Sequence, residues 1–239
     1  MKLPDFKALS FDCYGTLIDW ETGLLNSLAS LCGRVSRDLT RSEILQTYAR
    51  QESRQQKQTP SKLYSELMAI VFKRMAEEWG TPASWGECLQ FGESLKTWPA
   101  FPDSTESLTY LKKHYKLIIL SNVDNESFAA TNETLGITFD AVYTAQDIGS
   151  YKPDEANFHY MIESLERIGI ERSELLHTAQ SLFHDHEPAN RHGITSCWID
   201  RQHDNEEAGA TPVTDNVPRY DFRFQSLAEL VAAHRAEAA

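Results

Sequence analysis

The chain has 239 residues, of which 41% are hydrophobic and 24% are charged. That composition is typical of a soluble globular protein, and no stretch approaches the roughly 18 apolar residues of a membrane span. The 23 Lys and Arg residues against 35 Asp and Glu residues give a net charge of −12, which repels a polyanion. We therefore expect neither a membrane nor a nucleic acid as partner. The first residues hold no apolar signal-peptide core, so we expect a cytoplasmic protein.

The predicted elements begin with a buried strand. The segment Phe6–Phe11 is short and apolar and is followed by Asp12 and Gly15, which is typical of a strand that ends in a loop. About a hundred residues without a strand signal come next, far more than usually connect neighbouring elements. This interval must therefore contain helices of its own.

Two helices are expected in this interval. Ser42–Gln56 is a polar-rich helix, and Pro60–Trp79 carries an apolar stripe at helical spacing after Thr59 and Pro60. The stripe consists of Leu63, Leu67, Ile70, Val71, Met75 and Trp79. We expect an all-helical cap at 18–98, inserted into a core formed by 1–17 and 99–239.

The rest of the chain alternates between strand and helix signals. Four further strands are expected at Lys116–Ser121, Ala141–Ala145, Leu175–Ala179 and Thr195–Ile199. Helices are expected at Asp103–His114 with Asp103 as N-cap, at Asp154–Ile168, and at Ser226–Ala236 with Ser226 as N-cap. Residues 201–220 form a polar connector. This alternation predicts an α/β fold with a doubly wound, mostly parallel sheet.

Polar residues follow several of these strands. In a doubly wound sheet, ligands bind at the carboxyl ends of the strands where the strand order reverses, so these residues are candidates for one site. They are Asp12, Tyr14 and Thr16, then Ser121 and Asn122, then Tyr151 and Lys152, then Gln180, Ser181, His184 and Asp185. A nucleophilic carboxylate, a cation, hydroxyl and amide donors and a second carboxylate would meet there.

The motifs D-x-Y-G-T-L, L-S-N, Y-K-P and a late acidic segment, in this order, resemble the haloacid dehalogenase superfamily. More narrowly, they resemble the type II 2-haloacid dehalogenases. The resemblance implies a Rossmann-like fold with a helical cap and a hydrolase that uses neither cofactor nor metal. It implies that Asp12 displaces halide from a short 2-haloacid, and that water then cleaves the aspartyl ester to give a 2-hydroxy acid. A homodimer is a further expectation from this resemblance.

The resemblance also implies roles for individual residues. Lys152 would keep Asp12 ionised, and Asp185 would hold Lys152 in place. From the cap, Arg50 would receive the halide and Tyr64 would form a pocket wall. The residues expected to bind the substrate or hold the nucleophile are Tyr14, Thr16, Arg50, Tyr64, Ser121, Asn122, Gln180 and Ser181.

Two alternatives remain open at this point. The first is a Mg²⁺-dependent phosphatase using Asp12, although phosphatases of this superfamily carry an acid where this chain has Tyr14, because a leaving alkoxide needs a proton. The second is a binding protein with impaired turnover, because Gln180, Leu182 and Phe158 replace polar groups that dehalogenases use. The run from His184 to Glu187 is interpreted as a solvated helix start and not as a metal site.

Overall fold

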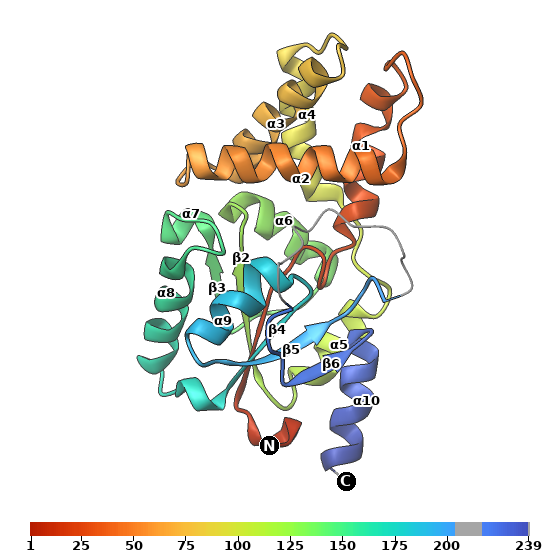
Figure 1. Cartoon of the computed structure of the whole chain (residues 1–239). Helices are drawn as coiled ribbons and strands as arrows, with labels where there is room; N and C mark the ends of the chain where they lie inside the picture. The colour runs from red at the N-terminus through yellow and green to blue at the C-terminus, as the bar shows by residue number, and fades with distance from the viewer. Residues whose placement is uncertain (204–216, 239) are drawn as a thin grey trace.

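A parallel sheet forms the centre of the molecule in the computed structural model, which describes residues 1–203 and 217–238. Its strands are β1 (Ala8–Phe11), β2 (Lys116–Ser121), β3 (Ala141–Thr144), β4 (Leu175–Ala179), β5 (Thr195–Ile199) and β6 (Phe222–Phe224). They pair in the order β3-β2-β1-β4-β5-β6, and every pair is parallel. The chain therefore reverses its direction across the sheet at β1, and the crevice beyond that strand's carboxyl end is the expected ligand position. The predicted doubly wound sheet is confirmed (Figure 1).

Helices cover both faces of the sheet because successive strand residues point to opposite sides. Ala8 belongs to an apolar cluster with α8 (Glu155–Glu166) and α9 (Glu187–Arg191). Leu9 belongs to a second cluster with α5 (Ser104–Leu111) and α10 (Leu227–Ala238). The other core helices are α6 (Asn125–Leu135), α7 (Ala145–Ile148), the short 3-10 helices η1 (Leu3–Asp5) and η3 (Arg172–Glu174), and the π-helix η4 (Leu182–His186).

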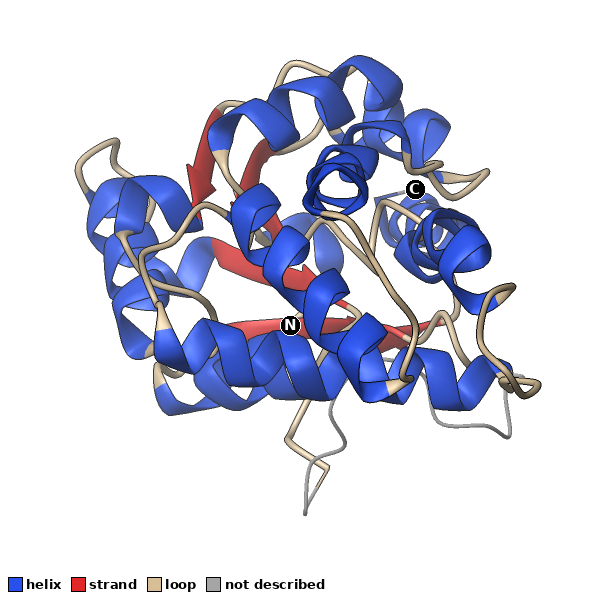
Figure 2. Cartoon of the chain, turned by 90° about the horizontal axis from the view of Figure 1, so that it is seen from above, coloured by secondary structure: helices blue, strands red, loops and turns tan. Residues whose placement is uncertain are grey.

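Four helices between β1 and β2 lie over the carboxyl ends of the strands (Figures 1 and 2). They are α1 (Trp20–Cys32), α2 (Arg41–Gln58), α3 (Tyr64–Glu78) and α4 (Trp85–Ser94), followed by the turn η2 (Leu95–Thr97). We call α1–α4 the helical insert. Its two connections to the core run side by side. The backbone N–H of Asp19 donates to the carbonyl of Pro99 at 2.8 Å, and that of Phe101 donates to the carbonyl of Leu17 at 3.0 Å. The domain boundary at 18–98 stays a prediction.

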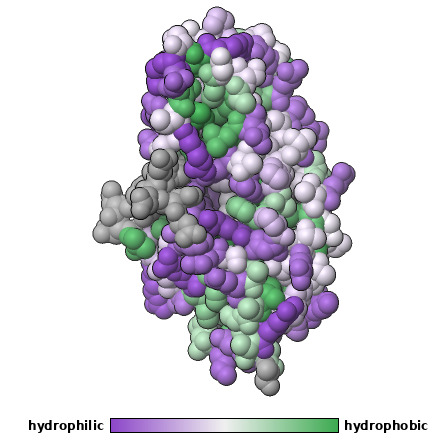
Figure 3. All heavy atoms as spheres, turned by 90° about the vertical axis from the view of Figure 1, so that its right-hand side faces the viewer, coloured by the Kyte–Doolittle hydropathy of each residue, from purple (hydrophilic) through white to green (hydrophobic). Residues whose placement is uncertain are grey.

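The interior of the helical insert is continuous with one of the core clusters. Leu67, Val71 and Met75 of the predicted stripe are buried on α3. A Cβ atom at Gly92 would lie 2.3 Å from the carbonyl oxygen of Ser65, so only glycine lets α4 approach α3 this closely. On the face shown in Figure 3, the most hydrophobic residues in view lie mainly on the insert. No helix in the described ranges is long and apolar enough to cross a lipid bilayer.

Several element boundaries differ from the predicted ones. Helix α3 begins at Tyr64 and not at Pro60, because Lys62 donates to the carbonyl of Thr59 and closes a turn there. Asp103 stands at the N-cap of α5 but caps nothing with its side chain, since its carboxylate pairs with Arg201 at 2.9 Å. The edge strand β6 was not predicted. Most of the connector expected at 201–220 lies outside the described residues.

Candidate active site

A small cavity lies between the carboxyl ends of β1, β2 and β4 and the helical insert. Its volume is about 60 Å³, enough for a handful of atoms, since one water needs roughly 10–15 Å³. We call the core residues Asp12, Ser121, Lys152 and Asp185 the floor, and the insert residues Trp20, Glu52, Gln56 and Tyr64 the roof. The other lining residues are Tyr14, Asn122, Val123, Gln180, Ser181 and His184. Residues from four predicted strand ends therefore line one cavity.

The ammonium group of Lys152 is the centre of the floor. Its side chain is 1% exposed, and its Nζ donates to Asp12 Oδ1 at 2.9 Å and to Asp185 Oδ1 at 2.7 Å. A third hydrogen bond of 2.8 Å reaches the carbonyl of Leu120. Because an ammonium has three protons, all of them have acceptors. Lys152 therefore fixes the distance between the two carboxylates.

Asp12 follows β1 directly, and each of its two carboxylate oxygens accepts a hydrogen bond. Its Oδ2 accepts a hydrogen bond of 2.8 Å from the hydroxyl of Thr16, and Thr16 Oγ1 accepts one of 2.9 Å from the backbone of Gln180. The backbone N–H of Asp12 donates to Thr178 on the neighbouring strand β4. Thr16 thus contacts the carboxylate and does not reach out into the cavity. Both oxygens of Asp12 are oriented by donors before any substrate binds.

Asp185 is held by a chain of buried polar groups. Its Oδ1 lies 2.9 Å from Nε2 of His177, whose Nδ1 lies 2.8 Å from the hydroxyl of Ser10 on β1. Its Oδ2 is buried and has no partner among the described residues. Asp185 therefore keeps one oxygen free to accept a hydrogen bond from a bound molecule.

Ser121 and Asn122, at the end of β2, make different contacts. Asn122 donates from Nδ2 to the carbonyl of Lys152 at 3.0 Å and accepts from that residue's N–H at 2.6 Å, so it fixes the lysine backbone. The hydroxyl of Ser121 is buried, lines the cavity and has no partner among the described residues. A buried hydroxyl without a partner is unfavourable unless a ligand supplies one. Ser121 is therefore the better candidate for a substrate contact.

Tyr14 lines the cavity two residues after Asp12. Its hydroxyl lies 2.6 Å from Thr131 Oγ1 on α6, and its ring stands edge-on to Trp98. Gly15 follows with φ of 98°, a left-handed conformation that favours glycine. Position 14 therefore offers an anchored phenol and no carboxyl group.

The roof contains a buried carboxyl group that sequence reasoning missed. The hydroxyl of Tyr64 donates to Glu52 Oε1 at 2.5 Å and lies 3.0 Å from the hydroxyl of Tyr48. Tyr64 is thus a cavity wall, as expected, and also a hydrogen-bond donor. Gln56 lines the cavity one helical turn after Glu52. A signal was present, since the apolar positions 45 and 48 of α2 continue at helical spacing as polar residues at 52 and 56.

The late segment lines the cavity but is not a solvated helix start. Asp185 and His186 are fully buried, and His186 bonds to Ser196 Oγ and to the carbonyl of Ala179. Ser181 lines the cavity and accepts a hydrogen bond from the backbone of His184 at 3.0 Å. The backbone of this segment packs against β4 and β5, which explains why its polar side chains are buried. The expectation of a solvated segment was wrong.

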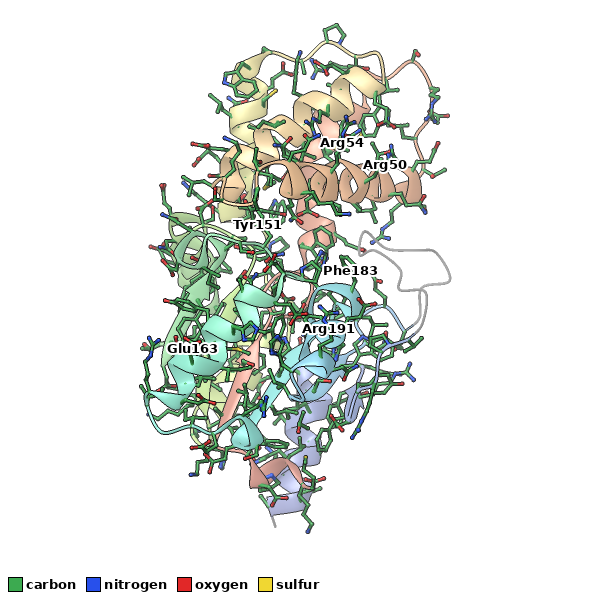
Figure 4. The ribbon with its side chains drawn as sticks, turned by 60° about the vertical axis from the view of Figure 1, so that its left-hand side comes forward. Arg50, Arg54, Tyr151, Glu163, Phe183 and Arg191 are labelled. Atoms are coloured by element: carbon green, nitrogen blue, oxygen red, sulfur yellow. The ribbon has the colours of Figure 1, made fainter. Side chains whose placement is uncertain are left out.

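Arg50 does not reach the cavity. Its side chain is 56% exposed and pairs with Glu78 on α3 at 2.5 Å. Figure 4 shows Arg50 and Arg54 on α2, above Tyr151 and Phe183, which lie where the core meets the insert. The helix turns Glu52 and Gln56 toward the cavity, so residue 50 points elsewhere. The expected halide contact of Arg50 is therefore incorrect. Phe158 does not line the cavity either, and packs edge-on against His177.

The floor groups shift one another's pKa values. Burial raises the pKa of the Asp12 carboxyl, although the Lys152 ammonium opposes this. Burial also acts to raise the pKa of Asp185, but Lys152 and His177 outweigh it and lower that pKa well below its usual range. The pKa of Lys152 is raised, because attraction to both carboxylates exceeds the effect of burial. Lys152 and Asp185 thus stay charged near neutral pH.

The cavity suits an ammonium group better than a divalent cation. Mg²⁺ prefers carboxylate oxygens, and both carboxylates of the floor already share Lys152. The side chains at 14 and 180 add a phenol and an amide to the lining. Elsewhere in the described ranges, ligand atoms of Glu155, His159 and His192 lie within 4.8 Å of one another, and that glutamate pairs with Arg191.

A family model for haloacid dehalogenase-like hydrolases matches residues 6–178. The L-2-haloacid dehalogenase from Xanthobacter autotrophicus, solved with chloropropionic acid covalently bound, has 18% identity and a TM-score of 0.78 over 96% of this chain and 98% of that one. A defluorinating L-2-haloacid dehalogenase, Rha0230, has 20% identity and a TM-score of 0.77 over 98% and 99%. The magnesium-bound putative hydrolase YfnB from Bacillus subtilis has 17% identity and a TM-score of 0.74 over 96% and 99%. No curated protein matches the sequence.

These structures share the fold of the chain, and the family model covers most of its length, including β1, β2 and Lys152. A parallel sheet with its polar residues at the switch point agrees with that match. The chain belongs to the haloacid dehalogenase-like hydrolases.

Proposed function

We propose that this hydrolase removes halide from short 2-haloalkanoic acids through an aspartyl ester on Asp12 and releases 2-hydroxy acids. One observation carries the proposal. Both oxygens of Asp12 accept hydrogen bonds, and its side chain lines a small cavity. Position 14, two residues later, has no acid that could protonate a leaving alkoxide. Halide is a weak base and leaves without a proton, so this arrangement favours dehalogenation over phosphate ester hydrolysis.

The first step is an in-line displacement. A lone pair on Asp12 forms a bond to C2 of the acid while the carbon–halogen pair leaves with the halide. The carboxylate of the substrate needs donors, and the unpartnered hydroxyl of Ser121 is one that the floor provides. Lys152 lowers the cost of an ionised Asp12 in a buried position.

The second step hydrolyses the ester. Water adds to the carboxyl carbon of Asp12, the bond from that carbon to the product oxygen breaks, and the product oxygen takes a proton. Asp185 lines the same floor, and its Oδ2, which has no partner among the described residues, would accept a hydrogen bond from this water. One haloacid anion and one water thus give a hydroxy acid anion, a halide ion and a proton.

The test is halide release from a panel that includes (S)-2-chloropropionate, bromoacetate and fluoroacetate. We expect release by the wild type and none by Asp12→Asn, whose amide is not a nucleophile. Intact-mass spectrometry should show the ester on the wild-type chain alone. Phosphate release that needs Mg²⁺, without halide release from any haloacid, would contradict the proposal. An adduct that forms and never hydrolyses would indicate a binding protein.

A further inference from the structure

The roof of the cavity contains the carboxyl group of Glu52. A departing halide would be expected to meet a cation at such a position. Among the described residues that line the cavity, Lys152 is the only lysine or arginine, and its three protons go to Asp12, Asp185 and Leu120. Glu52 on α2 is 8% exposed and forms part of the opposite wall. No cation of the lining is therefore left for the halide.

The direction of the displacement brings the leaving atom to this roof. In an in-line attack, the bond that breaks lies opposite the attacking oxygen. The nucleophile Asp12 stands on the floor, at the end of β1, so the halogen leaves toward the insert. The side chains there are Trp20, Glu52, Gln56 and Tyr64.

The contacts around Glu52 show which of its two oxygens already accepts a hydrogen bond from the protein. Tyr64 donates to Oε1, and the hydroxyl of Tyr48 lies 3.0 Å behind that of Tyr64. Oε1 is thus an acceptor, so a neutral Glu52 would carry its proton on Oε2 and could donate one hydrogen bond from there.

We propose that Glu52 binds the departing halogen as a neutral carboxyl group that donates a hydrogen bond, and that the site therefore takes 2-fluoroalkanoic acids as its substrate class. This proposal rests on the proposed function and specifies its leaving group. Fluoride is the strongest hydrogen-bond acceptor among the halides and the poorest leaving group, so it gains most from a donor. The bonding pair leaves on fluoride, Glu52 keeps its proton, and the ester hydrolyses as above.

Burial of Glu52 makes its charge sensitive to pH near neutrality. Burial raises the pKa of Glu52 to about 7, and the hydrogen bond from Tyr64 opposes this only in part. The titratable groups that face it are Tyr48 and Tyr64 of the insert and Tyr151, Asp12, Lys152, His184 and Asp185 of the core. The three phenols have raised pKa values and stay neutral, and Lys152 is balanced by two carboxylates. Above pH 7 an ionised Glu52 would repel fluoride.

The experiment compares fluoroacetate with bromoacetate at pH values from 6 to 8.5. Glu52→Ala should lose about 100-fold in fluoride release and less than about fivefold in bromide release at pH 6, because only fluoride depends strongly on the donor. The wild-type rate with fluoroacetate should fall as the pH rises through 7. In Glu52→Gln this fall should vanish, and the loss at pH 6 should be smaller than in Glu52→Ala, because an amide still donates. Glu77→Gln, an exposed residue on α3, is the matched control and should behave as the wild type.

The outcomes separate the two proposals. Equal losses with both substrates in Glu52→Ala, or a wild-type rate that does not change between pH 6 and 8.5, would overturn the role of Glu52 while dehalogenation stands. Bromide release without fluoride release would also overturn it. The absence of any halide from the wild type would overturn the proposed function and this inference together.

Discussion

The floor and the roof of the cavity both bury carboxyl groups, but they stabilise them differently. On the floor, Asp12 and Asp185 share one buried ammonium, and each has a further donor in Thr16 or His177. On the roof, Glu52 accepts a hydrogen bond from Tyr64, whose hydroxyl contacts that of Tyr48, and no cation among the described residues pairs with it. A neighbouring cation lowers the cost of charge on a buried carboxylate, whereas a buried carboxyl group without a cation favours the protonated form.

In the proposed reaction, this difference separates two chemical tasks. The nucleophile must be ionised and oriented before substrate binds, and the cation and hydrogen-bond donors of the floor favour both. A group that meets a departing anion must not itself be an anion, and burial without a cation provides that. The roof also belongs to a separate set of helices, so its chemistry can change while the floor stays the same.

The largest expected effect comes from removing the cation of the floor. Lys152→Met leaves two buried carboxyl groups that take up a proton, so Asp12 becomes a poor nucleophile. We expect ester formation with bromoacetate at pH 7 to slow by at least about 1,000-fold, which corresponds to about 4 kcal/mol. Single-turnover intact-mass spectrometry measures the rate of ester formation. The control is Lys62→Met, which removes the lysine of the exposed ion pair with Glu66. A rate of ester formation in Lys152→Met within tenfold of the wild-type rate would contradict the role of the cation on the floor.

The next effect concerns stability at the roof. The pKa of Glu52 is raised from its ordinary value of 4.5 to about 7 in the folded chain. Between pH 4.5 and pH 7 the folded state therefore binds more protons than the unfolded state, and the folded state loses stability as the pH rises through this range. We expect Glu52→Gln to be more stable than the wild type by about 3 kcal/mol at pH 8.5 and equal to it near pH 4.5. Urea unfolding at both pH values measures this. A difference that does not depend on pH would contradict a neutral Glu52.

A smaller effect is expected for the free hydroxyl of the floor. Ser121→Ala should raise KM for a haloacid about tenfold, equal to about 1.4 kcal/mol, because a donor to the substrate carboxylate is lost. Stability should hardly change, since the hydroxyl has no partner among the described residues. Ser127→Ala on α6 is a control, because this serine is likewise buried but lies outside the cavity lining. Equal KM values in both variants would exclude the contact.

The smallest effect is expected at Arg50. Its ion pair with Glu78 is exposed, and such pairs contribute about 0–1 kcal/mol. Arg50→Gln should change halide release by less than about twofold, because the side chain does not line the cavity. A large loss, measured in the same assay as for Glu52→Ala, would return the halide contact to Arg50.

The floor was predictable from the sequence because its residues lie at the end of a strand or in the segment that follows one. Short apolar segments fix the strands β1, β2 and β4, and parallel strands bring their carboxyl ends to one edge. The position of Asp12 next to Lys152, 140 residues apart in the chain, follows from that topology together with the family motifs.

The roof was not predictable in the same way. Which face of α2 meets the cavity depends on the packing of α1, α3 and α4 and on loops whose lengths carry no periodic signal. The resemblance to dehalogenases pointed to Arg50, but the helix places Glu52 at the cavity and Arg50 in solvent. The hydrogen bond from Tyr64 to Glu52 joins two helices and has no signature in either one.

Covalent attack by Asp12 is tested most directly by one turnover in water enriched in heavy oxygen, with the protein in excess over the haloacid. If water cleaves the ester at the carboxyl carbon, the label enters the peptide that contains Asp12, the peptide with Asp185 stays unlabelled, and the hydroxy acid carries ordinary oxygen. Heavy oxygen in the hydroxy acid and none in Asp12 would show that water attacks the substrate directly, and would contradict the ester.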